Sequence, residues 1–404
     1  MPPADPQGLE VVIFGGGGAG LWLLDDLVSR GIGTLLLEAG DLGGGQTIAS
    51  QGIIHGGLKY TLSGLLTPSA QTIKSMPERW RRCLAGEGAP DLRGTRLRAE
   101  YCHLWQTTSL RSRLSMIGAR AGLQTAPVRI DRHARPPVLA QCPGLVARLD
   151  EQVIEPASLI ADLARRHPRR ILAIDAEYGL EFELDGPGQV EVIRLINPQT
   201  GAPIDLRPRH VVFTAGAGNA DLGRRVGLSG RTMQRRPLHM VVARGDLPVL
   251  NGHCIDGATA RVTVTSTRDS ANRAIWQIGG QIAEEGVEME PPRLIAHAKA
   301  ELFAVLPGLQ LSGVDFSTYR IDRAEAATRG GFRPTDARYI RTGNVVSGWP
   351  TKLALVPRLA EKLGRSLGEP AGPRPPEAPD LGDWPHPRVA LPPWEKEEQW
   401  SLGD

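Results

Sequence analysis

The sequence predicts an α/β fold with a central parallel sheet and a second, antiparallel sheet. An apolar run, Val11 to Phe14, is followed by four glycines, a segment of helical spacing and a second apolar run that ends at Glu38. Another strand-and-helix block starts at Gln152 and ends in VVFTAGAG, residues 211–218. Between residues 235 and 321, several strand-like runs are joined by loops rich in Asp and Gly. Strand, helix and strand in succession indicate a parallel sheet, whereas the later runs are typical of an antiparallel one.

The glycines after the first strand have the spacing G-x-G-x-x-G, formed by Gly15, Gly17 and Gly20. Gly15 permits a tight turn, Gly17 lets the backbone approach a pyrophosphate, and Gly20 lets the helix and strand pack closely. The helix N-terminus carries free N–H groups and a partial positive charge. Glu38, at the end of the second strand, can accept hydrogen bonds from a ribose 2′-OH and would repel a 2′-phosphate. The segment therefore predicts a dinucleotide site that disfavours NADP.

Composition excludes several classes of function. The 404 residues are 41% hydrophobic and 23% charged, as is usual for globular proteins, and the net charge of +3 is too small to indicate a nucleic-acid partner. The four cysteines have no C-x-x-C spacing, so we expect neither a metal site nor a redox motif. The N-terminus lacks the pattern of a signal peptide, and no apolar run approaches 18 residues. We expect a cytoplasmic protein, and the sequence leaves open a peripheral contact with the inner face of a membrane.

The remaining elements can be placed along the chain. We expect helices at 69–84, 110–121, 291–306 and 352–367, a β-meander within 170–196, a strand at 344–347 and a tight turn at 348–351. The Pro-rich tail from residue 368 is expected to be extended or mobile, with three tryptophans available as anchors. We predict a discontinuous cofactor domain from residues 1–75, 145–234 and 322–368, a substrate domain from 76–144 and 235–321, and a tail from 369–404.

Five landmarks occur in a fixed order along the chain. They are GGGGAG with Glu38, IIHGGLKY (53–60), EPASLIADLA (155–164), VVFTAGAG, and GGFRPTDARYI with GWPTKLAL (330–340 and 348–355). In this order the chain resembles FAD-dependent oxidoreductases of the D-amino-acid oxidase superfamily, and within it FAD-dependent glycerol-3-phosphate dehydrogenases. PLHMVV (237–242) also resembles that branch. The resemblance implies a Rossmann-like FAD-binding domain of the glutathione-reductase type, with a β-meander and an inserted antiparallel substrate domain.

The chain departs from the dehydrogenase branch in two places. It ends soon after the last helix of the flavin domain, where longer members carry a helical domain. The segment GGGQTIASQG (43–52) also lacks the serine-arginine run of that branch. The resemblance therefore implies FAD as the cofactor and leaves the substrate open.

The resemblance implies contacts along the whole cofactor. The ADP half would be held by the glycine-rich turn and Glu38, the ring by the loop after the second strand, and the adenine region by the backbone of Val153. The turn before the last helix would stabilise negative charge on the reduced cofactor. The expected cofactor residues are Gly15, Gly17, Gly18, Gly20, Glu38, Gln46, Thr47, Ser50, Gln51, Gly52, Val153, Ala215, Gly216, Gly348, Trp349, Pro350, Thr351 and Lys352.

Five residues are candidates for substrate binding and catalysis. Arg333 matches the position whose guanidinium binds a carboxylate or phosphate in the family, and a planar fork suits that task. Lys59 and Tyr60 match the last two positions of the family's HGG-L-[RK]-Y motif. His239 and His55 are candidate bases, because imidazole accepts protons near neutral pH. His239 could equally be a satisfied core histidine, and His55 could pack under the ring or mark covalent attachment.

The expected function is an FAD-dependent dehydrogenase or oxidase acting on a CH–OH group, or less readily on a CH–NH group. A small anionic substrate, such as a hydroxy acid, a polyol phosphate like glycerol 3-phosphate, or an amino acid, would give a hydride to FAD. The electron acceptor is left open between oxygen, a quinone and a partner protein. An NAD-dependent dehydrogenase would leave the later landmarks unexplained. The other alternative is an FAD-binding subunit of a larger amine or opine dehydrogenase complex, without turnover of its own.

Overall fold

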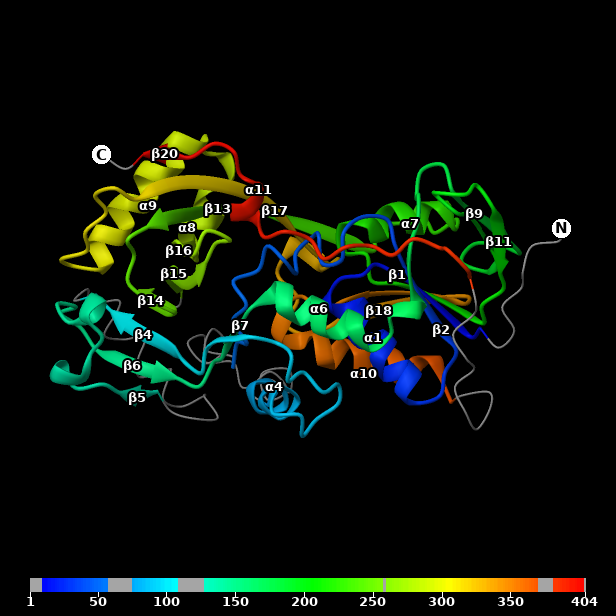
Figure 1. The fold of residues 1–404 in the computed structure, drawn as a ribbon, viewed down its shortest axis with the longest axis horizontal. Helices are drawn as coiled ribbons and strands as arrows, with labels where there is room; N and C mark the ends of the chain where they lie inside the picture. Colours follow the sequence, from blue (N-terminus) through cyan, green and yellow to red (C-terminus); the bar gives the residue numbers. More distant parts are fainter. Residues whose placement is uncertain (1–8, 57–74, 108–126, 257–258, 370–380, 403–404) are drawn as a thin grey trace.

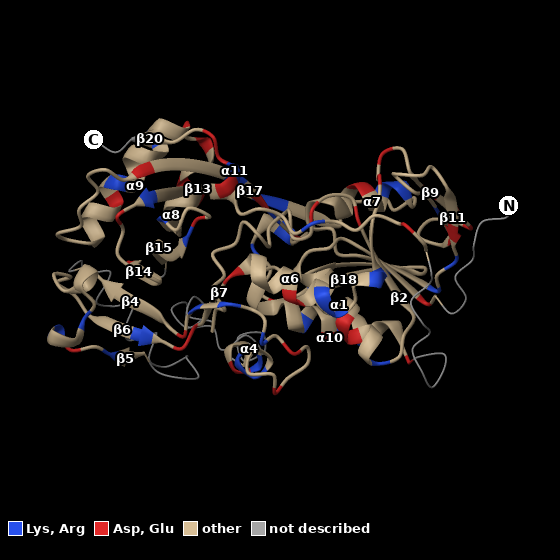
Figure 2. Ribbon diagram, in the orientation of Figure 1, with Lys and Arg blue, Asp and Glu red and all other residues tan. Residues whose placement is uncertain are grey.

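The computed structural model describes residues 9–56, 75–107, 127–256, 259–369 and 381–402. Two sheets lie side by side along the long axis of the molecule, and the long strands of the second sheet extend towards the first (Figure 1). Lys and Arg are interspersed with Asp and Glu over both halves (Figure 2). None of the helices in these ranges is long and apolar enough to cross a membrane.

The first sheet has six strands in the order β18-β19-β12-β1-β2-β8, all parallel except β18 at the edge. The strands are β1 (Val11–Phe14), β2 (Thr34–Glu38), β8 (Ile171–Ala173), β12 (His210–Phe213), β18 (Arg338–Thr342) and β19 (Val345–Trp349). Both faces of β1 are buried, which explains its unbroken apolar run.

Helices cover one face of this sheet and a β-meander covers the other. Ile13 packs with the helical side, whereas Val12 and Phe14 pack with the meander, as the alternation of a strand requires. The helices are α1 (Gly18–Ser29), α4 (Met76–Leu84), α6 (Pro156–Arg166) and α10 (Val356–Leu367). The meander consists of β9 (Leu180–Leu184), β10 (Val190–Ile196) and β11 (Pro203–Leu206).

The second sheet has nine strands in the order β20-β17-β13-β16-β15-β14-β4-β6-β5. They are β4 (Cys102–Gln106), β5 (Val128–Arg129), β6 (Val146–Leu149), β13 (Met233–Gly245), β14 (Gly252–Asp256), β15 (Thr259–Arg268), β16 (Ala274–Gly279), β17 (Asp315–Ala326) and β20 (Ser401–Leu402). Neighbours are antiparallel except β14 and β4, which run parallel. Helix α9 (Pro291–Val305) contributes Leu294, Ala298 and Leu302 to the core behind this sheet. The two-sheet α/β fold predicted from the sequence is confirmed, with one parallel pair added to the substrate sheet.

The remaining elements are short. They are β3 (Leu97–Ala99), β7 (Val153–Ile154), α7 (Asn219–Arg225), α8 (Gln281–Glu285), α11 (Pro393–Lys396) and the 3₁₀ turns Arg132–Ala134, Pro137–Leu139, Pro168–Arg170, Gly216–Gly218, Gly286–Glu288, Arg329–Gly331 and Leu353–Leu355.

Two domain boundaries differ from those predicted. Trp80 of α4 packs edge-on against Trp22 of α1, with ring centroids 4.9 Å apart, so residues 76–84 join the core of the first sheet and not the substrate domain. Strand β6 belongs to the second sheet, so the cofactor domain resumes after residue 149 instead of at residue 145. The predicted helix at 110–121 and residues 69–74 lie outside the described ranges.

The last helix begins at Val356 and not at Lys352 as predicted. Thr351 has a left-handed backbone (φ 69°) and Lys352 is extended (φ −144°), so the helix cannot start there. A 3₁₀ turn, Leu353–Leu355, intervenes.

The described part of the tail, residues 381–402, is packed against both sheets (Figure 1). The Trp384 indole donates to the Ala173 carbonyl, and the Leu42 N–H donates to the Arg388 carbonyl. Trp394 is buried against the second sheet, and β20 pairs with β17 at its edge. Apart from the short helix α11, this part of the tail is extended, which was one of the two expectations, and it is held against the body by these contacts.

Candidate functional site

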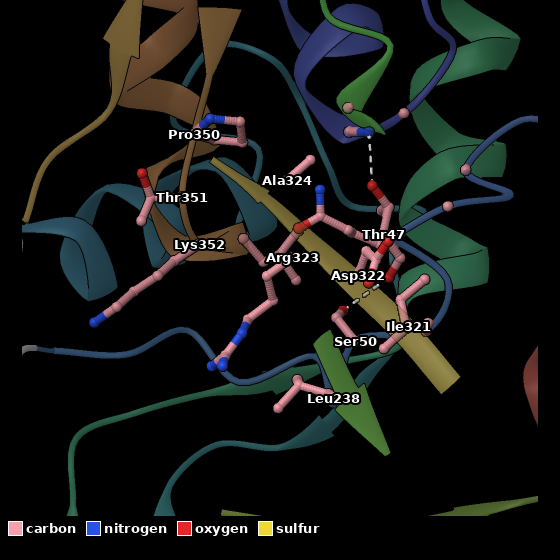
Figure 3. A pocket seen from close by; sticks show the side chains of 18 of the residues that line it. Thr47, Ser50, Leu238, Ile321, Asp322, Arg323, Ala324, Pro350, Thr351 and Lys352 are labelled. Atoms are coloured by element: carbon pink, nitrogen blue, oxygen red, sulfur yellow. Dashed lines mark hydrogen bonds between the residues drawn. The ribbon is translucent and has the colours of Figure 1, made fainter. Parts of the chain in front are cut away.

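A cavity of about 950 Å³ lies between the two sheets. One wall is the glycine-rich turn after β1, the loop after β2 and the turn after β12, all at the C-terminal ends of parallel strands. Ligands bind at this edge of α/β sheets. The opposite wall comes from β13 and β17 of the second sheet. Figure 3 shows side chains from β13, β17, the loop after β2 and the turn after β19 around this space.

The cavity brings together most of the residues that the sequence singled out. Those that line it are Gly15, Gly17, Gly18, Glu38, Gln46, Thr47, Ser50, Gln51, Gly52, His55, Ala215, Gly216, Arg333, Gly348, Trp349, Pro350, Thr351 and Lys352. Gly20, Val153 and His239 do not line it. Lys59 and Tyr60 lie outside the described residues.

At two of its three predicted glycines, Gly15 and Gly20, the glycine-rich turn leaves no room for a side chain. Gly15 has a φ of 106°, and a Cβ there would lie 2.5 Å from the Ala215 Cα. A Cβ on Gly20 would lie 2.0 Å from the Gly15 carbonyl oxygen, so Gly20 acts by packing under the turn and not by lining the cavity. Glu38 accepts hydrogen bonds from the Gly16 and Gly40 N–H groups at 2.5 and 2.8 Å. The turn and Glu38 thus form a cradle of backbone and carboxylate that fits the ADP half of a dinucleotide.

The loop after β2 is held to the second sheet by side-chain hydrogen bonds. Gln51 Nε2 donates to the carbonyls of Thr263 and Gln277 at 3.2 and 2.9 Å. The buried Tyr319 hydroxyl donates to the Ala49 carbonyl at 2.9 Å. Val153 pairs with Ile53 at the end of this loop, so it supports the loop from behind. These contacts fix the backbone at the centre of the cavity.

The turn after β19 is held in a strained conformation at the cavity edge. Thr351, with its left-handed backbone, donates a hydrogen bond to the Asp336 carbonyl at 3.2 Å. Such a conformation costs on the order of 1–3 kcal/mol in a non-glycine residue and is frequent at functional sites. Lys352 follows, and its side chain lines the cavity (Figure 3).

Cationic side chains line the cavity on several sides. Arg333 and Lys352 were predicted, and β17 adds Arg320 and Arg323. Lys352 and Arg323 are labelled in Figure 3. Arg323 Nη1 pairs with Glu284 Oε1 at 3.0 Å, and Arg320 Nη1 donates to the Val287 carbonyl at 2.5 Å. The sequence contained Arg323 in a strand without any motif, so its place at the cavity could not be inferred. The tail adds Lys396.

His55 lies beside a buried carboxylate that sequence reasoning did not find. Its Nδ1 is 3.4 Å from Oε2 of Glu151, and the Gly56 N–H donates to Glu151 Oε1 at 2.7 Å. His253 Nε2 is 3.4 Å from the same Oε2, and its Nδ1 is 3.0 Å from the Thr263 hydroxyl. His253 also lines the cavity. The donor atoms of His55, Glu151 and His253 are close enough together to hold a metal ion, as is found for no other group within the described ranges. The sequence had predicted no metal site.

Burial and the facing charges set the ionisation of this group. Burial lowers the pKa of His55 to about 4, although Glu151 acts in the opposite direction. Burial raises the pKa of Glu151, but hydrogen bonds from His253 and His55 outweigh it and hold that pKa well below its usual range. At neutral pH His55 is therefore neutral and Glu151 is ionised.

His239 is not placed to act as the base that the sequence suggested. Strand side chains alternate, so Leu238 and Met240 face the cavity and His239 faces the other side of the sheet. Its side chain is 1% exposed, and its Nδ1 is 3.1 Å from the Gly286 carbonyl. It is a satisfied core histidine, the other interpretation that the sequence allowed.

Comparison with known proteins gives a family match over most of the chain. Residues 10–354 match the profile of the family described as "FAD dependent oxidoreductase" (DAO). The probable FAD-dependent oxidoreductase PA4991 of Pseudomonas aeruginosa is 39% identical over 400 residues, which cover 96% of this chain and 99% of that protein. Its crystal structure superposes with a TM-score of 0.81 over 98% of this chain and 99% of that one, at 36% sequence identity in that alignment.

More distant likenesses point to different named activities. A stretch of 61 residues is 39% identical to glycerol-3-phosphate dehydrogenase 1 of Mycobacterium tuberculosis; it covers 15% of this chain and 12% of that protein. Glycine oxidase from Geobacillus kaustophilus has a TM-score of 0.63 at 16% identity, over 89% of this chain and 94% of that one, and so shares the fold.

Proposed function

Because the chain belongs to the FAD-dependent oxidoreductase (DAO) family, with FAD as its cofactor, we propose that it oxidises a small anionic substrate at a CH–OH group. The observation that carries this proposal is the shared cavity. The glycine-rich turn, the neutral imidazole of His55 and the cations Arg333 and Lys352 all line it. A dinucleotide, a proton acceptor and an anion-binding group therefore have room to meet in one place.

The chain's own residues would divide the work as follows. Gly15, Gly17 and Glu38 would hold the ADP half, and the loop from Gln46 to Gly52 would pass along the ring. When bound, FAD supplies the acceptor for a hydride from the substrate carbon. The turn at Lys352 would place positive charge near that acceptor.

Substrate binding would rest on Arg333, whose planar guanidinium can form two parallel hydrogen bonds with a carboxylate or phosphate. Hydroxy acids, polyol phosphates such as glycerol 3-phosphate and amino acids all present such a group. His55 would take the O–H or N–H proton, because its imidazole is neutral at pH 7 and lines the cavity. The arrangement favours His55 over His239 for this role.

The test is a substrate screen on the purified yellow protein under anaerobic conditions. The flavin absorbance near ~450 nm should bleach with the true substrate, which we expect among small acids and phosphates. Arg333→Leu should raise KM for that substrate about 10- to 100-fold, since charge-assisted hydrogen bonds contribute about 1.5–3 kcal/mol. Arg333→Lys, which keeps the charge without the fork, should show a smaller increase.

An unchanged KM in Arg333→Leu would remove that residue from the substrate site. A protein that carries FAD but is bleached by none of the acids, amines or phosphates would support the alternative of a subunit without its own turnover. Trp384 and Trp394 of the tail are buried against this chain and offer that alternative no exposed anchor.

A further inference from the structure

A buried carboxylate lies behind the histidine that lines the cavity. Glu151 follows β6, His253 is on β14, and His55 is in the loop after β2, so three separate elements bring these side chains together. Glu151 is 3% exposed and does not line the cavity, whereas the His55 side chain is 37% exposed and does. The Glu151 carboxylate is therefore separated from the cavity by the imidazoles, and it can influence a ligand there only through them.

The hydrogen bonds of Glu151 fix its orientation. Oε1 accepts from the Gly56 N–H at 2.7 Å, which ties the carboxylate to the residue next to His55. Oε2 is left facing two ring nitrogens, His55 Nδ1 and His253 Nε2, each at 3.4 Å. A buried ionised carboxylate is costly unless donors surround it, so His55 is held with its Nδ1–H towards Oε2. His253 Nε2 lies at the same distance but is not aligned for a hydrogen bond.

That arrangement determines which nitrogen of His55 is free. In a neutral imidazole one nitrogen carries the proton and the other accepts one. A proton on Nδ1, directed at Glu151, leaves Nε2 as the acceptor. The His253 ring lies 5.5 Å from the His55 ring, tilted by 32°, and is 4% exposed, so it also restricts the rotation of His55.

We propose that Glu151 and His253 are positioning residues that hold His55 in the tautomer and orientation of a proton acceptor, an inference that rests on the proposed function. With FAD bound to supply the acceptor for the hydride of the substrate C–H bond, the substrate O–H bond would break and its proton would form an N–H bond at His55 Nε2. The substrate carbon and oxygen are left as a carbonyl. Glu151 stabilises the resulting imidazolium and stays ionised itself, as the carboxylate of a catalytic triad does.

Among charged and titratable groups of the described residues, Glu151, Lys352 and His253 have the largest influence on His55. Glu151 favours the imidazolium, whereas Lys352 and His253 oppose it. Without the Glu151 carboxylate, only Lys352 and His253 would remain of these three groups, and both disfavour the imidazolium. His55 would then be a weaker base and would also lose its orientation.

One arm of the test needs no substrate. In FAD-loaded protein labelled with ¹⁵N-histidine, long-range imidazole spectra report the tautomer of each ring, and His55→Gln identifies the His55 signals. We expect the Nδ1–H tautomer in the wild type at pH 7 and a change towards Nε2–H in Glu151→Gln. An unchanged tautomer in Glu151→Gln would overturn the positioning role. One equivalent of a divalent metal that co-purifies with the wild type and is lost in Glu151→Gln would overturn it in favour of a metal site.

The second arm uses the substrate found in the screen. Glu151→Gln should lower kcat about 100-fold or more with KM little changed, because general-base catalysis contributes about 10²–10⁴-fold. His253→Asn should have a smaller effect, and Glu151→Asp should restore part of the rate. Glu301→Gln is the matched control: this carboxylate on α9 pairs with Arg261 of β15 and should leave kcat as it is.

The outcomes separate the two proposals. A wild type that no substrate bleaches overturns the proposed function. An active wild type in which His55→Gln is inactive but Glu151→Gln is not overturns the positioning role alone.

Discussion

At the residue scale, the ionisation of His55 makes stability depend on pH. Burial lowers its pKa from the ordinary 6.5 to about 4, so the unfolded chain binds this proton more readily than the folded one. The stabilising contribution of neutral His55 is complete above pH 6.5 and is lost as the pH falls towards about 4. The pKa of Glu151 is lowered as well, so its contribution is present above its ordinary value of 4.5 and is lost below that.

We expect the melting temperature of the wild type to fall between pH 6.5 and 4, and to fall less in His55→Gln, which has no proton to gain at this position. Differential scanning fluorimetry across this range measures both. His297→Gln serves as a control, because that histidine lies on the surface of α9, where it faces Glu285. Parallel curves for His55→Gln and the wild type would contradict the assigned ionisation.

Residue roles could be predicted from the sequence where a motif carried them. Gly15, Gly17, Gly18, Glu38 and Arg333, which motifs had marked in the sequence, line the cavity. Glu151 and His253 could not be found, because they meet His55 through the pairing of β14 with β4 and of β4 with β6. For His239 the sequence left two roles open, and the register of β13 against the cavity decides between them.

At the scale of elements, the strand, glycine turn and helix at residues 11–29 are determined locally. The spacing of apolar residues and glycines in this segment predicts both β1 and α1, which follow each other in the structure. The start of α10 was not predictable in this way, because the strained backbone of Thr351 is imposed by contacts such as its hydrogen bond to Asp336. The order of the nine strands also depends on pairings between distant segments.

Gly20→Ala tests the packing of that first element. Its Cβ would lie 2.0 Å from the Gly15 carbonyl oxygen and 2.8 Å from the Thr214 hydroxyl, so the turn must shift. We expect a loss of about 1–3 kcal/mol of stability, typical of overpacking, and loss of bound FAD. The ratio of absorbance at ~450 nm to protein absorbance measures FAD content after purification.

Gly223→Ala in α7 is the matched control, because its Cβ would meet its nearest neighbours at 3.9 Å. This variant should keep its FAD and its melting temperature, since alanine also favours the helix. Full FAD occupancy in Gly20→Ala would show that the turn tolerates the shift.

At the scale of the whole molecule, residues 381–402 join the two sheets. Trp384 is fixed to β8 of the first sheet, and Trp394 packs with Met240 and Tyr319 of the second. Composition predicted the extended conformation and suggested the tryptophans as anchors. It could not predict which surface they occupy, because a Pro-rich segment has no periodicity to show a buried face.

Trp394→Ala should destabilise the protein by about 3–5 kcal/mol, the usual range for truncating a buried tryptophan. Trp400→Ala is the comparison, because that ring is half-buried and contacts the Arg244 guanidinium at 3.9 Å, and its loss should cost less. Urea unfolding followed by circular dichroism compares the two midpoints. Equal midpoints would mean that Trp394 does not anchor the tail.

The interleaved order of the first sheet has a consequence for synthesis. Strand β1 has β12 as its neighbour, and β12 in turn needs β19, so the centre of this sheet is assembled from the beginning, the middle and the last part of the chain. While the ribosome is still translating, β1 and β2 have emerged, but β12, the other neighbour of β1, has not. The first sheet cannot be completed before β19, which starts at Val345, has left the exit tunnel, so its apolar strands are prone to aggregation through most of translation.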